Sequence, residues 1–153
     1  MTENSATNEN KFFASMNSNV REIIEKEFEK KSYKAGEKIV EEGSRGDSMF
    51  VILSGRCEVV RATRKEEKED IIATLEEGQL IGEASLIDNS PRNATVRAAN
   101  SVEVLRLRRE DLDRLKRSNP EAVLVLYETI IIQLASRFRS VTNKKDALSF
   151  WFS

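Results

Sequence analysis

The sequence predicts an α+β domain in which a small antiparallel β-barrel or jelly roll is flanked by N-terminal helices and by two C-terminal helices. Two observations support this class. Apolar residues follow a helical spacing near both ends of the chain, whereas residues 32–107 carry short apolar or alternating runs separated by glycines. Helices, then many strands, then helices is an order typical of such domains. A length of 153 residues is enough for one of them.

The N-terminal region is expected to contain a loose tail followed by helical segments. Residues 1–10 hold a single apolar residue after the first methionine, too few to offset the entropy lost on ordering. A helical spacing begins at Phe12 and Phe13 and resumes in residues 20–28. Asn19 is the expected N-cap of the second helix, because its short side chain can accept a hydrogen bond from a free backbone N–H group.

The strands expected in the middle of the chain are short and joined by turns. Residues 64–70 carry three positive and four negative charges, which indicates a solvated hairpin tip. Two further strands, 94–98 and 102–107, are expected to form a pair. The glycines that separate the strands are Gly36, Gly43, Gly46, Gly55 and Gly78.

Helical spacing returns after the strands. Leu112 and Leu115 lie three residues apart within the helix expected over 109–116. Pro120 then opens the last helix, expected over 121–139, because proline is well tolerated in a first turn. We expect the Asn119-Pro120 junction to act as a hinge.

These boundaries divide the chain into three parts. We expect a disordered tail over 1–10, one folded domain over 11–140 and a C-terminal extension over 141–153. Three aromatic residues lie within 147–152. They would dock on a partner, on a second copy or back on the barrel.

The composition excludes several classes of function. The chain has no histidine, so Ser-His-Asp and Cys-His catalysis cannot be encoded. Cys57 is its single cysteine and can form neither an internal disulfide nor a Cys/His zinc site. Aspartates are not clustered as catalytic metals require. We therefore expect no catalytic residue, no metal, no cofactor and no enzyme activity.

Charge and hydropathy bear on partners and location. With 25 basic and 26 acidic residues the net charge is −1, which argues against a protein that coats nucleic acid. Basic residues in 106–117 are interleaved with acids, so a solvated helix face is favoured there. No apolar run approaches the roughly 20 residues of a membrane span, and residues 1–10 do not resemble a signal peptide. We expect a cytoplasmic protein with no membrane span and no direct nucleic-acid binding.

The segment 78–98 carries the most informative chemistry. Gly82 is followed by residues 83–87, which can form one short helical turn whose free N–H groups suit an anion. Arg92 follows nine residues after Glu83, and its planar guanidinium suits two phosphate oxygens at once. A carboxylate at Glu83 can accept hydrogen bonds from sugar hydroxyls. A phosphate site beside such a carboxylate is typical of a ribose phosphate ligand.

Several motifs resemble those of the cyclic nucleotide-binding domain, which is shared by catabolite activator-type regulators, regulatory subunits of cyclic AMP-dependent kinase and cyclic nucleotide-gated channels. The resemblance covers residues 12–140. The cassette of that family has the form G-E-x-[AS]-L followed by P-R-x-A-[TV], and this chain has Gly82-Glu83-Ala84-Ser85-Leu86 and Pro91-Arg92-Asn93-Ala94-Thr95. The earlier glycine framework matches as well, with Tyr33 to Ile39, Gly43, Gly46 to Ile52, and Gly55.

The resemblance implies roles for individual residues. Arg92 is expected to bind the cyclic phosphate and Glu83 the ribose 2′-hydroxyl. The remaining phosphate oxygens would be bound in the turn at Gly82 by the backbone amides of Ala84, Ser85 and Ala94. Asn93 follows the arginine where a threonine favours cyclic GMP in the family, so cyclic AMP is the favoured ligand and cyclic GMP the alternative.

The last helix closes over the base in many members of the family. Leu134, Arg137 and Phe138 are the candidates for such a lid, because their spacing places them on one helical face. Core packing for Leu134 and Phe138 and solvent exposure for Arg137 are the alternatives.

These observations favour a cyclic nucleotide sensor that relays binding by moving its C-terminal helices. The helices would contact a protein effector or, in a homodimer, a second copy. One alternative is a fragment of a larger cyclic nucleotide-regulated protein such as a transcription regulator, since only 14 residues follow Arg139. A second is a degenerate interaction domain that binds no nucleotide.

Overall fold

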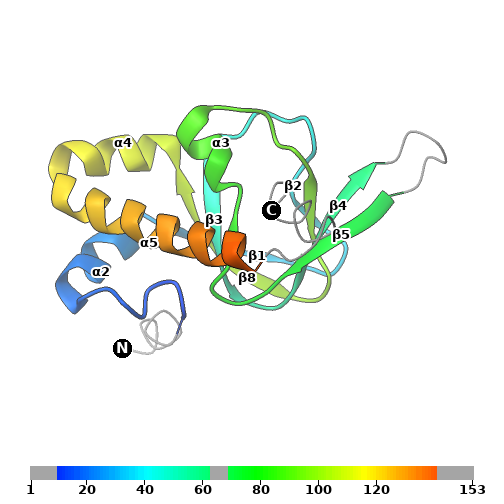
Figure 1. The fold of residues 1–153 in the computed structure, drawn as a ribbon, viewed down its shortest axis with the longest axis horizontal. Helices are drawn as coiled ribbons and strands as arrows, with labels where there is room; N and C mark the ends of the chain where they lie inside the picture. Colours follow the sequence, from blue (N-terminus) through cyan, green and yellow to red (C-terminus); the bar gives the residue numbers. More distant parts are fainter. Residues whose placement is uncertain (1–9, 63–68, 141–153) are drawn as a thin grey trace.

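The fold is described by a computed structural model, which covers residues 10–62 and 69–140 (Figure 1). Two four-stranded sheets lie at one end of the molecule and helices α2, α4 and α5 gather at the other. The helices are α2 (Ser18–Glu25), α3 (Glu83–Asp88), α4 (Arg109–Ser118) and α5 (Pro120–Arg139). The strands are β1 (Glu29–Tyr33), β2 (Lys38–Val40), β3 (Ser48–Ser54), β4 (Cys57–Ala62), β5 (Glu69–Leu75), β6 (Leu80–Ile81), β7 (Thr95–Ala98) and β8 (Val102–Arg108). The α+β class and the jelly-roll barrel are confirmed.

The two sheets have the strand orders β1-β8-β3-β6 and β2-β7-β4-β5, and all their pairings are antiparallel. Strands β7 and β8, expected to pair with each other, lie in different sheets. The short link between them, residues 99–101, carries the chain from one sheet to the other, so β7 pairs with β2 and β4 whereas β8 pairs with β1 and β3. That part of the prediction is wrong.

The two faces of β3 belong to two separate apolar cores. Met49, Val51 and Leu53 face the helices and join a core with residues of α2, α4 and α5. Phe50 and Ile52 face the space between the sheets and join the barrel core. Because side chains alternate along a strand, β3 acts as a wall between the helical layer and the barrel interior.

The N-terminal region departs from the prediction in two respects. The N-cap of α2 is Asn17, not Asn19, and its side chain accepts a hydrogen bond from the Val20 N–H group at 3.0 Å. Residues 11–15 form turns in place of the expected helical segment. Asn10, assigned to the tail, is fully buried, and its amide donates to the Ile52 carbonyl at 2.9 Å.

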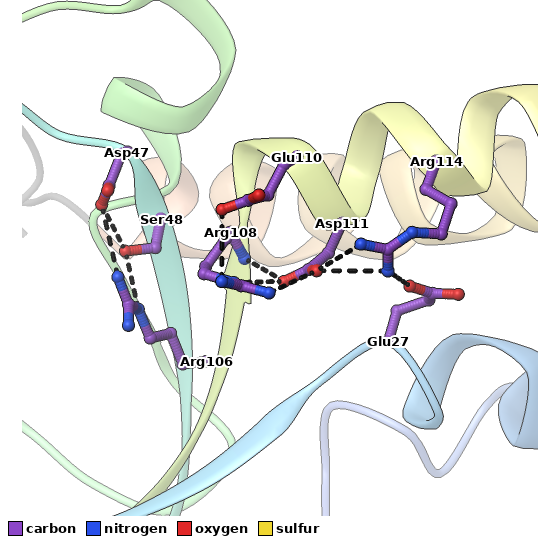
Figure 2. A network of polar contacts seen from close by, with 8 residues as sticks. All are labelled: Glu27, Asp47, Ser48, Arg106, Arg108, Glu110, Asp111 and Arg114. Atoms are coloured by element: carbon purple, nitrogen blue, oxygen red, sulfur yellow. Dashed lines mark hydrogen bonds and ion pairs between the residues drawn. The ribbon is translucent and has the colours of Figure 1, made fainter.

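The C-terminal helices follow the expected boundaries within a few residues. Asn119 caps α5 by accepting from the Ala122 N–H group at 3.1 Å, with Pro120 in the first turn. At the start of α4, the Asp111 carboxylate accepts from the Arg108 backbone N–H group at 3.0 Å (Figure 2). Among the described residues, no helix is long and apolar enough to cross a membrane.

Some expectations fall outside the described residues. They concern the tail over 1–9, most of the hairpin tip at 64–68, and the C-terminal extension with its aromatic residues at 141–153. Strands β4 and β5, on either side of the tip, do pair as an antiparallel hairpin.

Candidate functional site

The turn that enters α3 is built on Gly82. This residue has φ +71°, a left-handed conformation that glycine adopts without strain. A Cβ atom added there would collide with the Arg92 guanidinium. Gly82 therefore serves both the sharp turn from β6 into α3 and the close approach of the arginine.

Arg92 is held on both its backbone and its side chain. Its N–H group donates to the Ser44 carbonyl at 2.9 Å, and its carbonyl accepts from the Gly43 N–H group at 2.8 Å. The guanidinium donates from Nη1 to the Gly82 carbonyl at 2.8 Å and from Nη2 to the Ser48 carbonyl at 2.6 Å. The residue is only 6% exposed, so its orientation is fixed before any ligand arrives.

Charges of both signs surround Arg92. Burial lowers the pKa of its guanidinium, and the positive charge of Arg106 lowers it further, while Asp47 and Glu83 act in the opposite direction. The guanidinium remains charged, because arginine starts from a very high pKa. Two of its five N–H groups are used by the carbonyls of Gly82 and Ser48, which leaves three donors for another acceptor.

Glu83, the first residue of α3, is a buried carboxylate with one unused oxygen. It is 4% exposed, and among the described residues its Oε2 atom has no hydrogen-bond partner. Its Oε1 atom lies 3.4 Å from Nη1 of Arg137 on α5. Burial raises the pKa of Glu83, and the charges of Arg137 and Arg92 partly oppose that effect. An unpaired buried carboxylate oxygen is a strong acceptor for a hydroxyl group.

The other predicted cassette residues fall into two groups. Ser85 and Ala94 are buried, Ser85 against Gly46 and Ala94 in the barrel core. Ala84 and Asn93 are exposed. The structure thus brings Gly82, Glu83, Ser85 and Arg92 together, and leaves the base-reading role of Asn93 as a prediction.

The three lid candidates do not share one environment. Leu134 is partly buried against the helical core, and Phe138 is 62% exposed. Arg137, for which solvent exposure was the alternative, instead approaches Glu83 with a side chain that is 13% exposed. Their spacing on α5 still places them on one helical face, and their role as a lid stays a prediction.

Several residues of the site escaped the sequence analysis. Ser48 accepts from Arg92, and Arg109 at the start of α4 donates to the Ser85 carbonyl at 2.8 Å and to Asn89 Oδ1 at 3.2 Å. Gly46 lies so close to Ser85 and Arg92 that a Cβ atom there would collide with Ser85. The segment 46–48 belonged to a recognised motif, but nothing in its spacing indicated a contact with Arg92.

Comparisons with known proteins agree with this geometry. The family model "Cyclic nucleotide-binding domain" matches residues 30–119. A cAMP-dependent protein kinase regulatory subunit of Mycosarcoma maydis is 36% identical over 88 residues, which are 58% of this chain and 16% of that protein. The cyclic AMP receptor protein of Thermus thermophilus is 32% identical over 123 residues, which are 80% of this chain and 55% of that protein.

Solved structures give the same fold. The crystal structure of the Thermus thermophilus catabolite activator protein superposes with a TM-score of 0.71 and 29% identity, covering 90% of this chain and 62% of the other. The chain thus spans about half the length of the Thermus relative and about a sixth of the fungal one. The family model covers more than half of the chain, from β1 to the end of α4, and this protein therefore belongs to the cyclic nucleotide-binding domain family.

Proposed function

We propose that this protein is a cytoplasmic sensor that binds a cyclic mononucleotide, cyclic AMP in preference to cyclic GMP, and relays binding through its C-terminal helices without catalysing a reaction. The observation that carries the proposal is the buried Oε2 atom of Glu83, which has no partner among the described residues and lies on the same turn that Arg92 contacts.

The phosphate would bind at Arg92. Its side chain is already oriented by the carbonyls of Gly82 and Ser48, so little rotamer entropy is lost on binding. The free backbone amides of Ala84 and Ser85 at the start of α3 would bind further phosphate oxygens, and Ala94 would add another.

The ribose would bind at Glu83. A 2′-hydroxyl that donates to Oε2 would satisfy an acceptor that otherwise remains buried without a hydrogen bond. A ligand without this hydroxyl would leave the carboxylate oxygen unsatisfied. The proposal therefore predicts discrimination against 2′-deoxy analogues.

The preference for cyclic AMP rests on Asn93 and on the relatives. Asn93 stands where a threonine would favour guanine in the family, and the two relatives described above carry cyclic AMP in their names, although a cGMP-dependent protein kinase of Eimeria tenella also matches. The exposed side chain of Asn93 can meet either purine, so base preference is the finest part of the proposal.

The relay would pass through Arg137. This residue joins α5 to Glu83, so a ligand that binds Glu83 changes the contact that holds the end of α5. A ligand can shift α5 only by its different affinity for the two positions of the helix. The Asn119-Pro120 junction between α4 and α5 would absorb the movement.

The partner would be a second copy of the chain docked on α5. Leu124 and Ile131 lie seven residues apart and are 68% and 63% exposed, and Ile132 beside them is 58% exposed. A seven-residue apolar spacing is typical of helix pairing. An Ile131→Glu variant that sediments as the wild type does would show that this face pairs with no second copy and would leave a separate effector as the partner.

The central test is calorimetric titration of the purified chain with cyclic AMP, cyclic GMP and cyclic di-GMP in parallel. Wild-type protein should bind cyclic AMP most tightly. Arg92→Ala should weaken binding by roughly a hundredfold or more, since it removes a charge-assisted pair worth about 3 kcal/mol. Arg117→Ala, an exposed arginine on α4, is the matched control and should bind as the wild type does.

Two results would overturn the proposal. Wild-type protein that binds none of the three ligands would identify a degenerate interaction domain. Equal affinities of wild type and Arg92→Ala would exclude the cassette as the site. Whether the chain acts alone or as part of a longer regulator is a separate proposal, tested by the length of the native protein.

A further inference from the structure

A second pocket lies beside Arg92, between strands β1, β2, β3 and β8 and the segment 41–48. Its volume is about 320 Å³, which is within the range of small-molecule sites. Of the predicted cassette residues, Arg92 alone is among the described residues that line it. The pocket therefore meets the nucleotide site at one side chain and is otherwise separate from it.

Ser48 holds two guanidinium groups at the wall of this pocket. Its carbonyl accepts from Arg92 at 2.6 Å, and its hydroxyl accepts from Nε of Arg106 at 3.2 Å. Figure 2 shows Arg106 extending from β8 toward Ser48 and Asp47 at the start of β3. Two cationic side chains thus bind the two oxygen atoms of one serine.

Like charges held this close repel each other unless an anion lies nearby. Burial lowers the pKa of Arg92, the carboxylates of Asp47 and Glu83 raise it, and the charge of Arg106 lowers it again. Asp47 lies 3.6 Å from Arg106 and has a side chain that is 71% exposed to solvent. Asp47 is solvated, so it compensates the charge of Arg106 only in part, and Glu83 compensates Arg92 from the cassette.

The rest of the lining adds positive charge. Lys31 and Arg45 also line the pocket, and neither makes an ion pair with another described residue. The second acidic residue of the lining, Glu41, is paired with Lys38 at 3.4 Å and is 66% exposed. The pocket therefore carries four basic and two acidic side chains, of which Arg45 and both acids are exposed.

One wall of the pocket is apolar. Ile39, Val40 and Phe50 line it, and the latter two belong to the barrel core. Tyr33 also lines the pocket. Burial raises the pKa of Tyr33, although Arg106 opposes this, so its hydroxyl stays protonated at neutral pH and can donate a hydrogen bond. The lining offers basic donors together with an apolar surface.

We propose that this pocket is a second ligand site that binds a small organic phosphate, with its phosphate group between Lys31, Arg92 and Arg106 and its organic part against Ile39, Val40 and Phe50. Fixed guanidiniums suit phosphate oxygens, and the apolar wall is large enough for a body that inorganic phosphate lacks. The site needs neither Glu83 nor the amides of α3.

The shared arginine couples this site to the proposed nucleotide site. Two phosphates that bind one guanidinium would divide its donors and repel each other. Binding in the pocket should therefore weaken cyclic nucleotide binding, and the nucleotide should weaken the pocket ligand by the same factor, because coupling free energies are reciprocal.

The test uses phenyl phosphate as the probe and inorganic phosphate as its truncated counterpart, titrated into the full chain at low ionic strength. Phenyl phosphate should bind, and more tightly than inorganic phosphate. Arg106→Gln and Lys31→Gln should each weaken it roughly tenfold. Lys30→Gln is the control, since Lys30 neighbours Lys31 on β1 but pairs with Glu103 at 3.2 Å and does not line the pocket.

The outcomes separate this site from the cassette. Glu83→Gln should weaken cyclic nucleotide binding but not phenyl phosphate binding, whichever nucleotide the cassette takes, because Glu83 does not line the pocket and its charge opposes an anion at Arg92. Lys31→Gln and Arg106→Gln that both bind phenyl phosphate as the wild type does would overturn the proposal, as would a wild-type protein that does not bind it. Equal affinities for phenyl phosphate and inorganic phosphate would overturn the assignment of an organic ligand.

Discussion

The guanidinium of Arg137, near the end of α5, lies 3.4 Å from the carboxylate of Glu83, the first residue of α3. The two residues are 54 positions apart in the sequence. This ion pair joins the helix that packs on the barrel to the turn that Arg92 contacts. The end of α5 and the proposed ribose site consequently share one charged group.

The first prediction concerns the ionisation of Glu83. Arg137→Gln removes a positive charge that lowers the pKa of this carboxyl group, whereas the burial that raises it remains. Glu83 should therefore titrate at a higher pH in the variant, as measured by NMR of its side-chain carbon. Arg139 is exposed and lies two residues further along α5, so Arg139→Gln should leave the pKa of Glu83 unchanged. An unchanged pKa in Arg137→Gln would contradict the ion pair.

The second prediction concerns the stability cost of Glu83. Its pKa is raised in the folded state, so the folded state binds the proton more readily than the unfolded state and stability falls as pH rises through the folded pKa. Glu83→Gln should raise the free energy of unfolding at pH 7 by about 1 kcal/mol. The gain should shrink in acid, where the wild-type carboxyl is protonated. Urea unfolding at several pH values measures this, and a gain that does not depend on pH would refute it.

The third prediction compares two glycines with positive φ. Gly82→Ala meets both backbone strain at φ +71° and a collision with Arg92, whereas Gly36→Ala at φ +89° meets strain alone, with no atom within 4 Å. Gly36→Ala should lower the free energy of unfolding by about 1–2 kcal/mol, and Gly82→Ala by more. Only Gly82→Ala should also weaken cyclic nucleotide binding. Equal losses of stability in urea would show that Arg92 moves aside without strain.

The fourth prediction concerns Cys57. This thiol is fully buried, and burial raises its pKa to about 11. Since the thiolate is the reactive form, iodoacetamide should modify the native protein very slowly at pH 8. The rate should rise sharply across the urea unfolding transition, with mass spectrometry as the readout. Rapid modification of the native protein would show that β4 opens locally.

The fifth prediction concerns the network at the start of α4 (Figure 2). Asp111 accepts from the Arg108 backbone and side chain and pairs with Arg114, which also contacts Glu27. Burial would raise the pKa of Asp111, but its hydrogen bonds with Arg108 and the nearby charges lower it overall. Asp111→Asn should lower the free energy of unfolding at neutral pH by about 1–2 kcal/mol.

The pH dependence of this loss follows from the direction of the shift. Asp111 has a lowered pKa in the folded state, so its contribution is present above the unfolded pKa and is lost as pH falls through the folded pKa. The wild type and Asp111→Asn should therefore converge in strong acid. Asp113→Asn is the control, because its pair with Lys116 at 3.9 Å is half-exposed and worth little.

Local chemistry made part of the fold and site predictable. A glycine before a short apolar turn indicated where α3 starts, and a proline after Asn119 indicated the first turn of α5. The error at the N-cap of α2 shows how narrow such signals are. Asn17 and Asn19 carry the same side chain two residues apart, and the helix begins after the first of them, at Ser18.

Contacts between distant residues were not predictable in this way. Ser48 binds Arg92 across 44 positions because β3 and the segment before β7 lie side by side, and no spacing within either segment signals that contact. Lys31 and Arg106 line one pocket because β1 and β8 pair. The expected pairing of β7 with β8 failed for the same reason, since adjacency in sequence does not decide which sheet a strand joins.

Strand β3 links the packing of the two cores. Its alternate side chains are embedded in two different cores, Met49 among the helices and Phe50 inside the barrel, and one backbone carries both. A displacement of either residue must therefore strain the packing of the other. The sheet that separates the barrel interior from the helices thus also transmits packing changes between the two layers.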